Sequence, residues 1–533
     1  MGPTSLSTLF PLSVVLLIPL FFLVYQHSLN RRSSSGLPPG PTGRPFIGPL
    51  RDIQNRDVPM WILYSNWAKE YGDREEKVIS YRVLGKTTVV LGSYKAVNEL
   101  LERRSGNYSD RPEFHMLIGL MRYGWNMGFM RYSDWWRQHR KTFHRSFQPS
   151  VVPEYYDIQR EQTVSLMRKL ARPSSEGEFF GLVRHHAASI ILKIIYGYTL
   201  QEDSTNDPYI QMADRTAQGL KQAGVLGNFL VDYLPWLRWV PEWLPGGSFK
   251  TKGESWAKNN DALREVPWQW VKKAMDEGTA ERSFVTRCLE EIEKDSEEVI
   301  KNCAAVAFLG GADTTVSAVL SFILAMTLHP DIQKRAREEV DRVCAGRVPD
   351  FSDRYSSGGE DGFATNLTPK MPFVEAVLKE VLRWHPVAPL AAARRSVKDD
   401  VYKGYFIPAG STVIGSAWAV LHDEQLYGSH TERFNPDRFL SKTFQGPPPE
   451  DFAFGFGRRV CPGRFLGINT LWIVFVYLLT TLEMCPGEGF EGFDGVEENG
   501  KDRFRDGLLS HPYPFKCQFV PRNTGVARMI LGL

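Results

Sequence analysis

The chain has 533 residues, and its 64 basic residues nearly balance its 61 acidic ones, so the overall charge gives no basis for nucleic-acid binding. Apolar residues make up 43% of the sequence, which is enough to build a large buried core. The six cysteines form no CxxC pair and no paired zinc-ligand spacing, which argues against a zinc site and indicates reduced thiols.

An apolar segment at the N-terminus predicts a membrane anchor within residues 1–30. A helix over about residues 6–25 approaches the roughly 20 residues that cross a bilayer. Arg31 and Arg32 follow it, and the positive-inside rule then places the rest of the chain in the cytosol. A cleaved signal peptide is the alternative, but the segment lacks the basic start that such peptides have.

The next segment, residues 31–50, indicates a stiff hinge. It contains the run Leu37-Pro38-Pro39-Gly40-Pro41, and clustered prolines stiffen a chain and forbid a helix. No long linker follows, so residues 51–533 are predicted to form one domain. With that domain in the cytosol, the sequons at Asn107 and Asn366 are expected to carry no glycan.

The clearest β structure of the first half is a hairpin, because residues 78–84 and 87–91 are rich in β-branched side chains and flank a Gly85-Lys86 turn. A basic helix is expected further on. Trp136 and Arg140 are four residues apart and therefore share one helix face. Their indole N–H and guanidinium can both donate to a carboxylate, and a basic surface helix is the alternative.

An aromatic segment follows at residues 225–249. It holds Trp236, Trp239 and Trp243 among several prolines, a combination that disfavours a continuous helix. Tryptophan settles at the headgroup level of membranes, so the segment suits an interfacial element. Ordinary packing explains the same residues equally well.

A long apolar helix with a polar notch is predicted over residues 295–328. The run Asp295-Ser296-Glu297-Glu298 resembles a capping box at its start. The notch, residues 310–315, places two glycines and a carboxylate in the middle of the helix, and both are unfavourable there. One interpretation is a kink with a satisfied Asp313. The other is a small pocket in which Thr314 offers a hydroxyl and Asp313 relays protons.

Another helix is predicted from Pro372 to Trp384, stopped by a proline. Glu380 and Arg383 lie on one of its faces at i and i+3, and Arg438 follows in a later segment, Phe434-Asn-Pro-Asp-Arg-Phe439. The pair by itself is also compatible with an exposed helix surface, where it would be worth only about 0.2–0.5 kcal/mol.

Two loop regions of the second half also give expectations. Residues 351–368 are rich in Gly and Ser and are expected to form a mobile surface loop, and a gene-model artefact would give the same appearance. Residues 401–415 predict a β-hairpin with its turn at Pro408-Ala409-Gly410.

The most informative stretch lies near the C-terminus, where Phe454-x-x-Gly-x-Arg-x-Cys-x-Gly463 precedes a long apolar run. Cys461 lies between glycines that allow close backbone approach, and beside Arg458, Arg459 and Arg464, which favour a thiolate. Such a thiolate can bind haem iron. A buried free cysteine is the alternative for an isolated residue.

This stretch resembles the haem-binding loop of the cytochrome P450 family. The helix with Trp136 and Arg140, the notch at residues 310–315, and the Glu380/Arg383 helix are similar to further family signatures in the same order. The resemblance implies a mainly α fold with a smaller β part, here preceded by a transmembrane helix.

By resemblance, Cys461 is the axial iron ligand, and Phe454 and Gly455 contact the haem. Trp136, Arg140, Arg459 and Arg394 (in preference to Arg395) are expected to bind its propionates. Asp313 and Thr314 correspond to the family's acid–alcohol pair. Glu380, Arg383 and Arg438 are expected to form a buried structural network.

The resemblance further implies a monooxygenase that contains haem b and uses O₂ and electrons from NADPH. Since no flavin, nicotinamide or iron–sulfur fingerprint occurs, a separate NADPH–cytochrome P450 reductase is expected. The expected substrate is an apolar small molecule of fungal secondary metabolism, such as a terpenoid, polyketide or aromatic intermediate. The expected location is the endoplasmic reticulum membrane, with a single span.

Two alternatives stay open. One is a haem-thiolate isomerase or dehydratase that needs no reductase, against which the intact Asp313–Thr314 pair argues. The other is a membrane-anchored haem-binding protein without turnover. NADPH consumption with a reconstituted reductase distinguishes these from a monooxygenase.

Overall fold

The structure is a computed structural model that describes residues 36–172, 175–201, 207–225, 227–244, 246–291, 297–356, 368–490 and 504–532. The predicted anchor within residues 1–30, the first part of the hinge and the sequon at Asn366 lie outside the described residues. Of the predicted long helix, the proposed capping residues Asp295 and Ser296 are likewise outside them.

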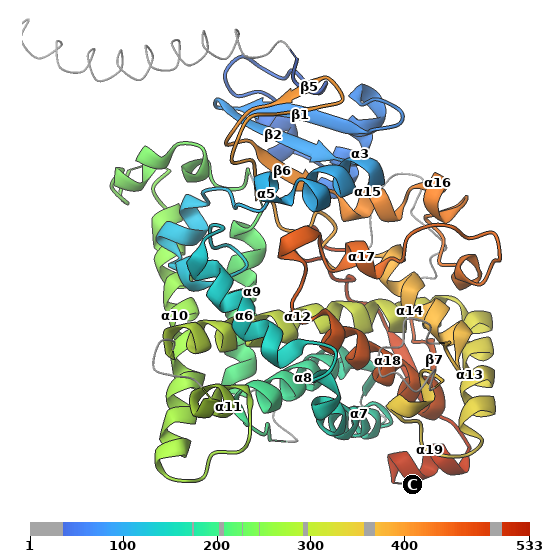
Figure 1. The fold of residues 1–533 in the computed structure, drawn as a ribbon. Coiled ribbons are helices and arrows are strands. Elements are labelled where there is room, and N and C mark those ends of the chain that lie inside the picture. Colours follow the sequence, from blue (N-terminus) through green and yellow to red (C-terminus); the bar gives the residue numbers. More distant parts are fainter. Residues whose placement is uncertain are drawn as a thin grey trace, which may run out of the picture.

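The chain folds into a small sheet region and a larger helical region, as predicted (Figure 1). The helices are α2 (Leu50–Gln54), α3 (Met60–Tyr71), α4 (Tyr94–Val97), α5 (Ser105–Tyr108), α6 (Asp134–Phe147), α7 (Tyr156–Leu170), α8 (Ser175–Tyr196), α9 (Pro208–Ala223), α10 (Phe249–Asp276), α11 (Phe284–Glu291), α12 (Glu297–Leu328), α13 (Pro330–Cys344), α14 (Pro372–Trp384), α15 (Ala417–Leu421), α16 (Glu424–Tyr427), α17 (Glu450–Ala453), α18 (Arg464–Thr481) and α19 (Gly525–Leu531).

The main sheet has four strands in the order β1-β2-β6-β3. β1 (Val78–Val83) and β2 (Lys86–Leu91) form the predicted antiparallel hairpin. β6 (Thr412–Gly415) pairs with β2 in parallel, and β3 (Arg394–Arg395) pairs with β6. This pairing places Arg394 in an edge strand of the sheet.

The predicted hairpin at 401–415 is wrong in its turn. β4 (Asp400–Tyr402) pairs with β5 (Tyr405–Ile407) through a tight turn at Lys403 and Gly404, both with positive φ. Gly404 meets this requirement because it has no Cβ. Residues 408–410 instead connect β5 to β6, and β6 belongs to the main four-stranded sheet.

The predicted long helix is α12, which crosses the middle of the molecule (Figure 1). It packs against α8 and α18. All three are apolar around most of their circumference, as expected of helices surrounded by protein. By length and composition, three helices of the described residues (178–196 of α8, all of α12 and all of α18) could cross a membrane, but most of each lies buried inside the fold.

The sequence-based predictions for two surface segments, residues 225–249 and 351–368, were confirmed to different extents. The described residues between 225 and 249 form no continuous helix, as expected, but short 3₁₀ turns, η5 (Leu230–Asp232) and η6 (Pro235–Trp239). The segment predicted as a mobile loop at 351–368 is anchored at its start, because Arg354 is buried and paired with Glu375 of α14. Residues 357–367 lie outside the described part of the chain.

Candidate functional site

The loop that carries Cys461 is built by two glycines and a short turn, η9 (Gly457–Arg459). Gly455 and Gly457 have φ of 82° and 52°, a region that favours glycine. A Cβ on Gly457 would lie 2.1 Å from the Leu101 carbonyl oxygen, so no other residue fits there. The Cys461 N–H donates to Phe454 O at 2.8 Å and closes the loop just before α18.

Cys461 lies at the junction of two adjoining cavities, of about 850 and 940 Å³ including the space at their mouths. Both cavities are also lined by Thr314, Thr315, Phe454 and Gly467. Residues more than 140 positions apart in the sequence therefore face one largely apolar space. A planar group held from Cys461 has room on both sides of that residue.

The two glycines of the α12 notch have different structural roles. A Cβ on Gly310 would meet nothing within 4 Å, so this position leaves open space in the cavity. A Cβ on Gly311 would lie 2.7 Å from the Ile191 side chain, so this glycine allows α8 to pack closely. The Thr314 hydroxyl donates to Gly310 O at 2.7 Å.

Asp313 does not line either cavity. Its carboxylate is buried beside two basic side chains: Lys221 Nζ of α9 lies 3.0 Å from Oδ2, and His511 Nε2 lies 3.1 Å from Oδ1. Burial favours the protonated acid, but the hydrogen bond and charge of His511 and the charge of Lys221 outweigh it and hold the pKa of Asp313 well below its usual range. Asp313 is thus an ionised group that connects three segments.

A set of buried arginines surrounds the Cys461 loop. Arg394 donates to Phe456 O at 2.8 Å, Arg140 to Val460 O at 2.6 Å, and Arg459 to the carbonyls of Ser109, Met127 and Met130. Arg111 donates to the carbonyls of Gly128, Ala392 and Ala393. Among the described residues, none of these four forms an ion pair. We call Arg111, Arg140, Arg394 and Arg459 the unpaired arginines.

The electrostatics of the unpaired arginines favour the binding of an anion. Burial lowers the pKa of Arg394 to about 9 and that of Arg459 to about 8, and it lowers the pKa of Arg111 well below the usual value. A guanidinium normally stays charged, and a buried charge is costly without a counter-charge. Arg111, Arg394 and Arg459 also line the cavity at Cys461. The residues present therefore fit a group that carries carboxylates and offers a metal ion to a thiolate, as haem does.

The predicted propionate residues differ in their positions. Arg394 and Arg459 line the cavity, whereas Trp136 and Arg140 are not among its lining residues. Trp136 Nε1 donates to Met127 O at 3.2 Å, and the Arg459 guanidinium stacks 4.3 Å from its ring centroid. Arg395, the neighbour of Arg394, pairs instead with Asp110.

Sequence reasoning missed Arg111, Lys221 and His511. Arg111 lies between an aspartate and a proline, with no periodic pattern to mark it. Lys221 and His511 meet Asp313 only through long-range folding. No fixed sequence spacing relates them to Asp313, so a sequence pattern could not have identified them.

The ionisation of Cys461 is not set by its neighbours alone. Burial raises the pKa of the thiol, while the Gly463 N–H and the charges of Arg140 and Arg464 act in the opposite direction and only reduce the shift. The sequence-based expectation that nearby arginines favour the thiolate is confirmed in direction for Arg464, but burial outweighs this effect on the pKa of Cys461 in the protein by itself. Metal coordination deprotonates a thiol outright.

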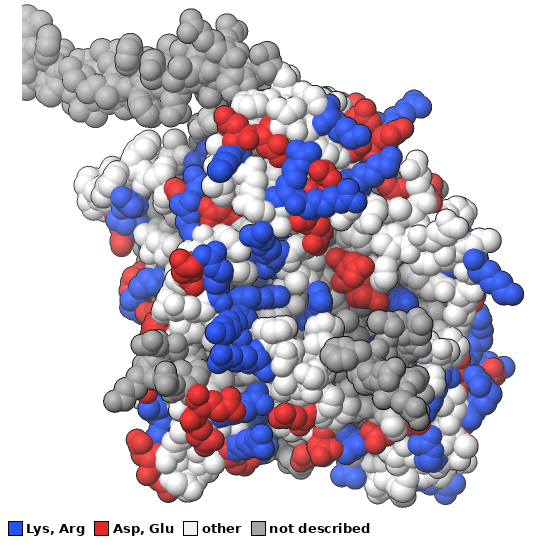
Figure 2. Space-filling view, viewed as in Figure 1, with Lys and Arg blue, Asp and Glu red and all other residues white. Residues whose placement is uncertain are grey.

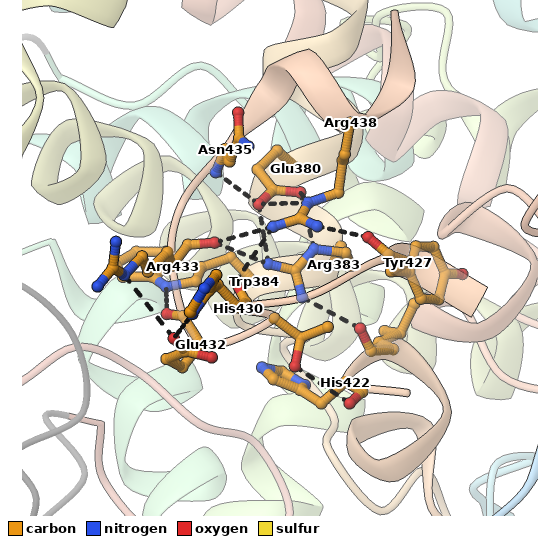
Figure 3. Close-up of polar contacts among 12 residues, drawn as sticks. Glu380, Arg383, Trp384, His422, Tyr427, His430, Glu432, Arg433, Asn435 and Arg438 are labelled. Atoms are coloured by element: carbon orange, nitrogen blue, oxygen red, sulfur yellow. Dashed lines mark hydrogen bonds and ion pairs between the residues drawn. The ribbon is translucent and has the colours of Figure 1, made fainter. Parts of the chain in front are cut away.

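The predicted structural network of Glu380, Arg383 and Arg438 is brought together in the structure (Figure 3). Arg383 binds both oxygens of Glu380, at 2.7 and 2.8 Å, and neither side chain is exposed. Arg438 Nε lies 3.2 Å from both oxygens of Glu380, and the Asn435 N–H donates to Oε1 at 2.7 Å. Each charge in this network therefore has a partner, and the network ties α14 to the 434–439 segment.

A basic patch lies on the outer surface near α6. Figure 2 shows Lys and Arg side chains gathered over this helix. Arg137, Lys141 and Arg145 of α6 are exposed there, and so is Arg458 from the Cys461 loop. We call these four residues the α6 patch. It lies directly outside the loop that carries the cysteine.

Comparisons with known proteins agree with this geometry. Residues 38–518 match the cytochrome P450 family. The chain is 38% identical over 532 residues to a cytochrome P450 monooxygenase of Armillaria gallica, covering 97% of this chain and 98% of the relative. It is 34% identical to tryptamine 4-monooxygenase of Psilocybe cyanescens, covering 97% and 100%.

Its fold matches a solved structure of a zebrafish cytochrome P450 with abiraterone, at a TM-score of 0.66 and 22% identity. That match covers 87% of this chain and all of the other, and it concerns the fold alone. The family match and the fungal relatives, which are named as monooxygenases, indicate the class of reaction. The chain therefore belongs to the cytochrome P450 family, and it is similar over nearly its whole length to fungal monooxygenases.

Proposed function

We propose that residues 51–533 form a single catalytic domain that inserts one oxygen atom from O₂ into an apolar small molecule. In this proposal Cys461 holds the iron of haem b, and electrons come from NADPH through a separate cytochrome P450 reductase. The haem supplies the redox chemistry when bound. The overall balance is one O₂, a pair of electrons and a pair of protons per substrate, with one oxygen atom leaving as water.

One observation carries the proposal: Cys461 and Thr314, from distant segments, face the same cavity, and unpaired arginines line it. Phe454 and Gly455 shape the wall beside the cysteine, and Arg111, Arg394 and Arg459 offer the donors that two propionates require. Trp136 and Arg140 of α6 support these residues from outside the cavity, through contacts with Arg459 and with Val460 O. Thr314 lies where a hydroxyl can hold a proton near the reacting atoms.

The substrate that best fits the cavity is neutral as well as apolar. Its wall includes Val387, Ala388, Ala391 and Ala392, which are small and apolar. No acidic side chain lines either cavity among the described residues, and the nearby carboxylate of Asp313 is already paired. An ammonium-bearing substrate therefore lacks a counter-charge, although one relative is named for acting on tryptamine. We propose a terpenoid, polyketide or neutral aromatic intermediate of fungal secondary metabolism.

A substrate-binding screen tests the proposed substrate class. Neutral terpenoids and polyketides are expected to shift the haem absorbance of the protein at low micromolar concentration, while tryptamine does not. The matched variant is Gly310→Ala, which adds a methyl group in open cavity space and is expected to weaken binding of bulky ligands. Tight binding of tryptamine would contradict the proposed substrate class.

We also propose that the protein is anchored in the endoplasmic reticulum membrane by one span within residues 1–30, with the domain in the cytosol. Trp236, Trp239 and Trp243 are 52%, 69% and 81% exposed, which suits contact with lipid headgroups. The α6 patch suits an acidic reductase. Changing the three tryptophans to Ser should weaken membrane partitioning of an anchor-deleted form, whereas Trp135→Ser, an exposed tryptophan on α6, should not.

The central experiment is reconstitution with NADPH–cytochrome P450 reductase and O₂. The wild type is expected to consume NADPH and form a hydroxylated or otherwise oxidised product, and Cys461→Ala is expected to abolish thiolate ligation and turnover. Thr314→Ala should still bind substrate but release more peroxide and less product. Product formed without NADPH would favour an isomerase or dehydratase, and haem binding without any turnover would favour a non-catalytic protein.

A further inference from the structure

A tight turn shortly before α6 presents its main-chain oxygens to two of the unpaired arginines. The Asn126 main-chain oxygen accepts from Phe129 N at 2.9 Å and from Met130 N at 3.0 Å. The side chain of Asn126 closes the turn, because its Oδ1 accepts from Gly128 N at 2.8 Å. Asn126 is only 4% exposed, so this hydrogen bond is shielded from water. We call residues 126–130 the carbonyl turn.

The two arginines donate directly to the carbonyl turn. Arg459 Nη1 donates to Met127 O at 3.1 Å, and its Nη2 donates to Met130 O at 2.7 Å. Arg111 Nε donates to Gly128 O at 2.7 Å. Both arginines also line the larger of the two cavities. The position of the carbonyl turn therefore sets where the two guanidinium groups lie beside that cavity.

Further contacts fix Arg459 to the same turn. Trp136 Nε1 of α6 donates to Met127 O at 3.2 Å, and the guanidinium of Arg459 stacks over the Trp136 ring. From the other side, Arg459 Nε donates to Ser109 O at 2.9 Å. Carbonyl oxygens and an aromatic ring thus surround this guanidinium, and a shift of the carbonyl turn would move it.

The turn leaves no room for a side chain at its third position. A Cβ on Gly128 would lie 3.0 Å from Asn126 Oδ1, closer than Cβ atoms normally come to another atom. Glycine allows this approach because it has no Cβ. Hydrogen bonds from an asparagine side chain to the main chain two residues further on are typical of turns. The pair Asn126 and Gly128 therefore specifies the turn by local chemistry.

Main-chain oxygens orient a guanidinium without neutralising its charge. A carbonyl accepts a hydrogen bond but carries no net charge, whereas a carboxylate also supplies the counter-charge. Arg383, which is paired with Glu380, illustrates the second case. Arg111 and Arg459 are held in the first way, so their positive charge stays available to an anionic group in the cavity.

We propose that Asn126 is a positioning residue for the cofactor: by closing the carbonyl turn, it holds Arg111 and Arg459 where they can bind the haem carboxylates. Asn126 is not among the residues that line either cavity, so it acts through the two arginines. This inference rests on the proposed function, in which these arginines bind the propionates.

The first test is haem transfer from the haem-loaded full chain to a competing apo-globin. Asn126→Ala removes the acceptor for Gly128 N and is expected to speed transfer about 2- to 12-fold, the equivalent of one hydrogen bond. Asn126→Ser keeps a weaker acceptor and is expected to lie between the wild type and Asn126→Ala. Gly128→Ala crowds the same contact and is expected to speed transfer as well. Wild-type transfer in both alanine variants overturns the inference.

Asn260→Ala is the matched control. Asn260 of α10 is fully buried, and its Nδ2 donates to Met121 O at 3.0 Å and to Arg122 O at 3.3 Å. It therefore holds the preceding part of the same loop without touching the carbonyl turn. The control is expected to lower the thermal midpoint but to keep haem transfer near the wild-type rate. Equal acceleration in Asn126→Ala and Asn260→Ala would mean that general loosening of the loop explains both, which overturns the positioning role.

A double-mutant cycle tests whether Asn126 acts through Arg459. Arg459→Met alone is expected to speed haem transfer, because a donor to the propionates is lost. In that background, Asn126→Ala is expected to add less than it does in the wild type. Fully additive effects overturn the inference, since they would show that the two residues act independently.

Resonance Raman spectroscopy of the haem-loaded chain supplies a readout that lost stability alone does not change. The propionate bending band is expected to shift in Asn126→Ala in the same direction as in Arg459→Met, and to stay in place in Asn260→Ala. A band that does not move in Asn126→Ala overturns the inference. Wild-type haem transfer and an unshifted band in Arg459→Met would instead count against the proposed haem site itself, as would a wild-type chain that takes up no haem.

Discussion

Two groups of buried arginines in this protein have opposite electrostatic situations. Arg383 and Arg438 share the carboxylate of Glu380, and the main chain completes their hydrogen bonding. Arg111, Arg140, Arg394 and Arg459 donate only to main-chain carbonyls and have no carboxylate partner among the described residues. The arginines of the first group have their counter-charge within the chain. Those of the second group would obtain a counter-charge from a bound anion.

This difference in charge pairing distinguishes arginines that stabilise the fold from arginines that we expect to bind the cofactor. A buried ion pair that is fully satisfied contributes little net stability but is costly to break. A buried charge without a partner destabilises the protein until a ligand supplies the counter-charge. We therefore expect substitutions in the two groups to act with different signs on the haem-free protein.

The largest effect is expected for Glu380→Gln. This change keeps the size of the side chain but leaves the fully buried guanidinium of Arg383 without its counter-charge. The free energy of unfolding should fall by about 3–5 kcal/mol, with or without haem. Urea unfolding of both forms measures it.

The matched control for this change is Asp437→Asn, which breaks an ion pair with Arg335 in which both side chains are about half exposed. Surface pairs are worth about 0–1 kcal/mol, so the control should change little. Equal losses in the two variants would mean that the Glu380 network has no special structural role.

An intermediate effect is expected for Arg394→Met. The haem-free protein should be as stable as the wild type or more stable, because an uncompensated buried charge is removed. Haem retention should fall about 10- to 150-fold, which corresponds to roughly 1.5–3 kcal/mol for hydrogen bonds to a charged group. Transfer of haem to a competing apo-globin measures the retention.

Arg395→Met is the control, since this neighbour pairs with Asp110 and does not line the cavity. It should leave haem transfer near the wild-type rate. A variant of Arg394 that destabilises the haem-free protein as strongly as Glu380→Gln would remove the distinction between the two groups.

Sequence patterns predicted the parts of this architecture that depend on local chemistry. The spacing of Glu380 and Arg383 on one helix turn, the glycines around Cys461 and the notch of α12 can all be read from neighbouring residues. Arg111, Lys221 and His511 could not be found in this way, because their partners lie 17 to 282 residues away along the chain. The hairpin turn at Lys403-Gly404 was missed because Pro408-Ala409-Gly410 carries a stronger local turn signal.

An effect of pH is also expected at Asp232, a buried carboxylate whose situation mirrors that of the unpaired arginines. Its Oδ1 accepts a hydrogen bond from Met116 N at 2.9 Å, and burial raises its pKa to about 7. The folded protein therefore keeps this proton up to about pH 7, while an unfolded Asp loses it near pH 4. Its contribution to stability is present below about pH 4 and is lost as the pH rises toward 7. Asp232→Asn should flatten this part of the thermal-midpoint profile, and parallel profiles for the two proteins would show that Asp232 is ionised in the fold.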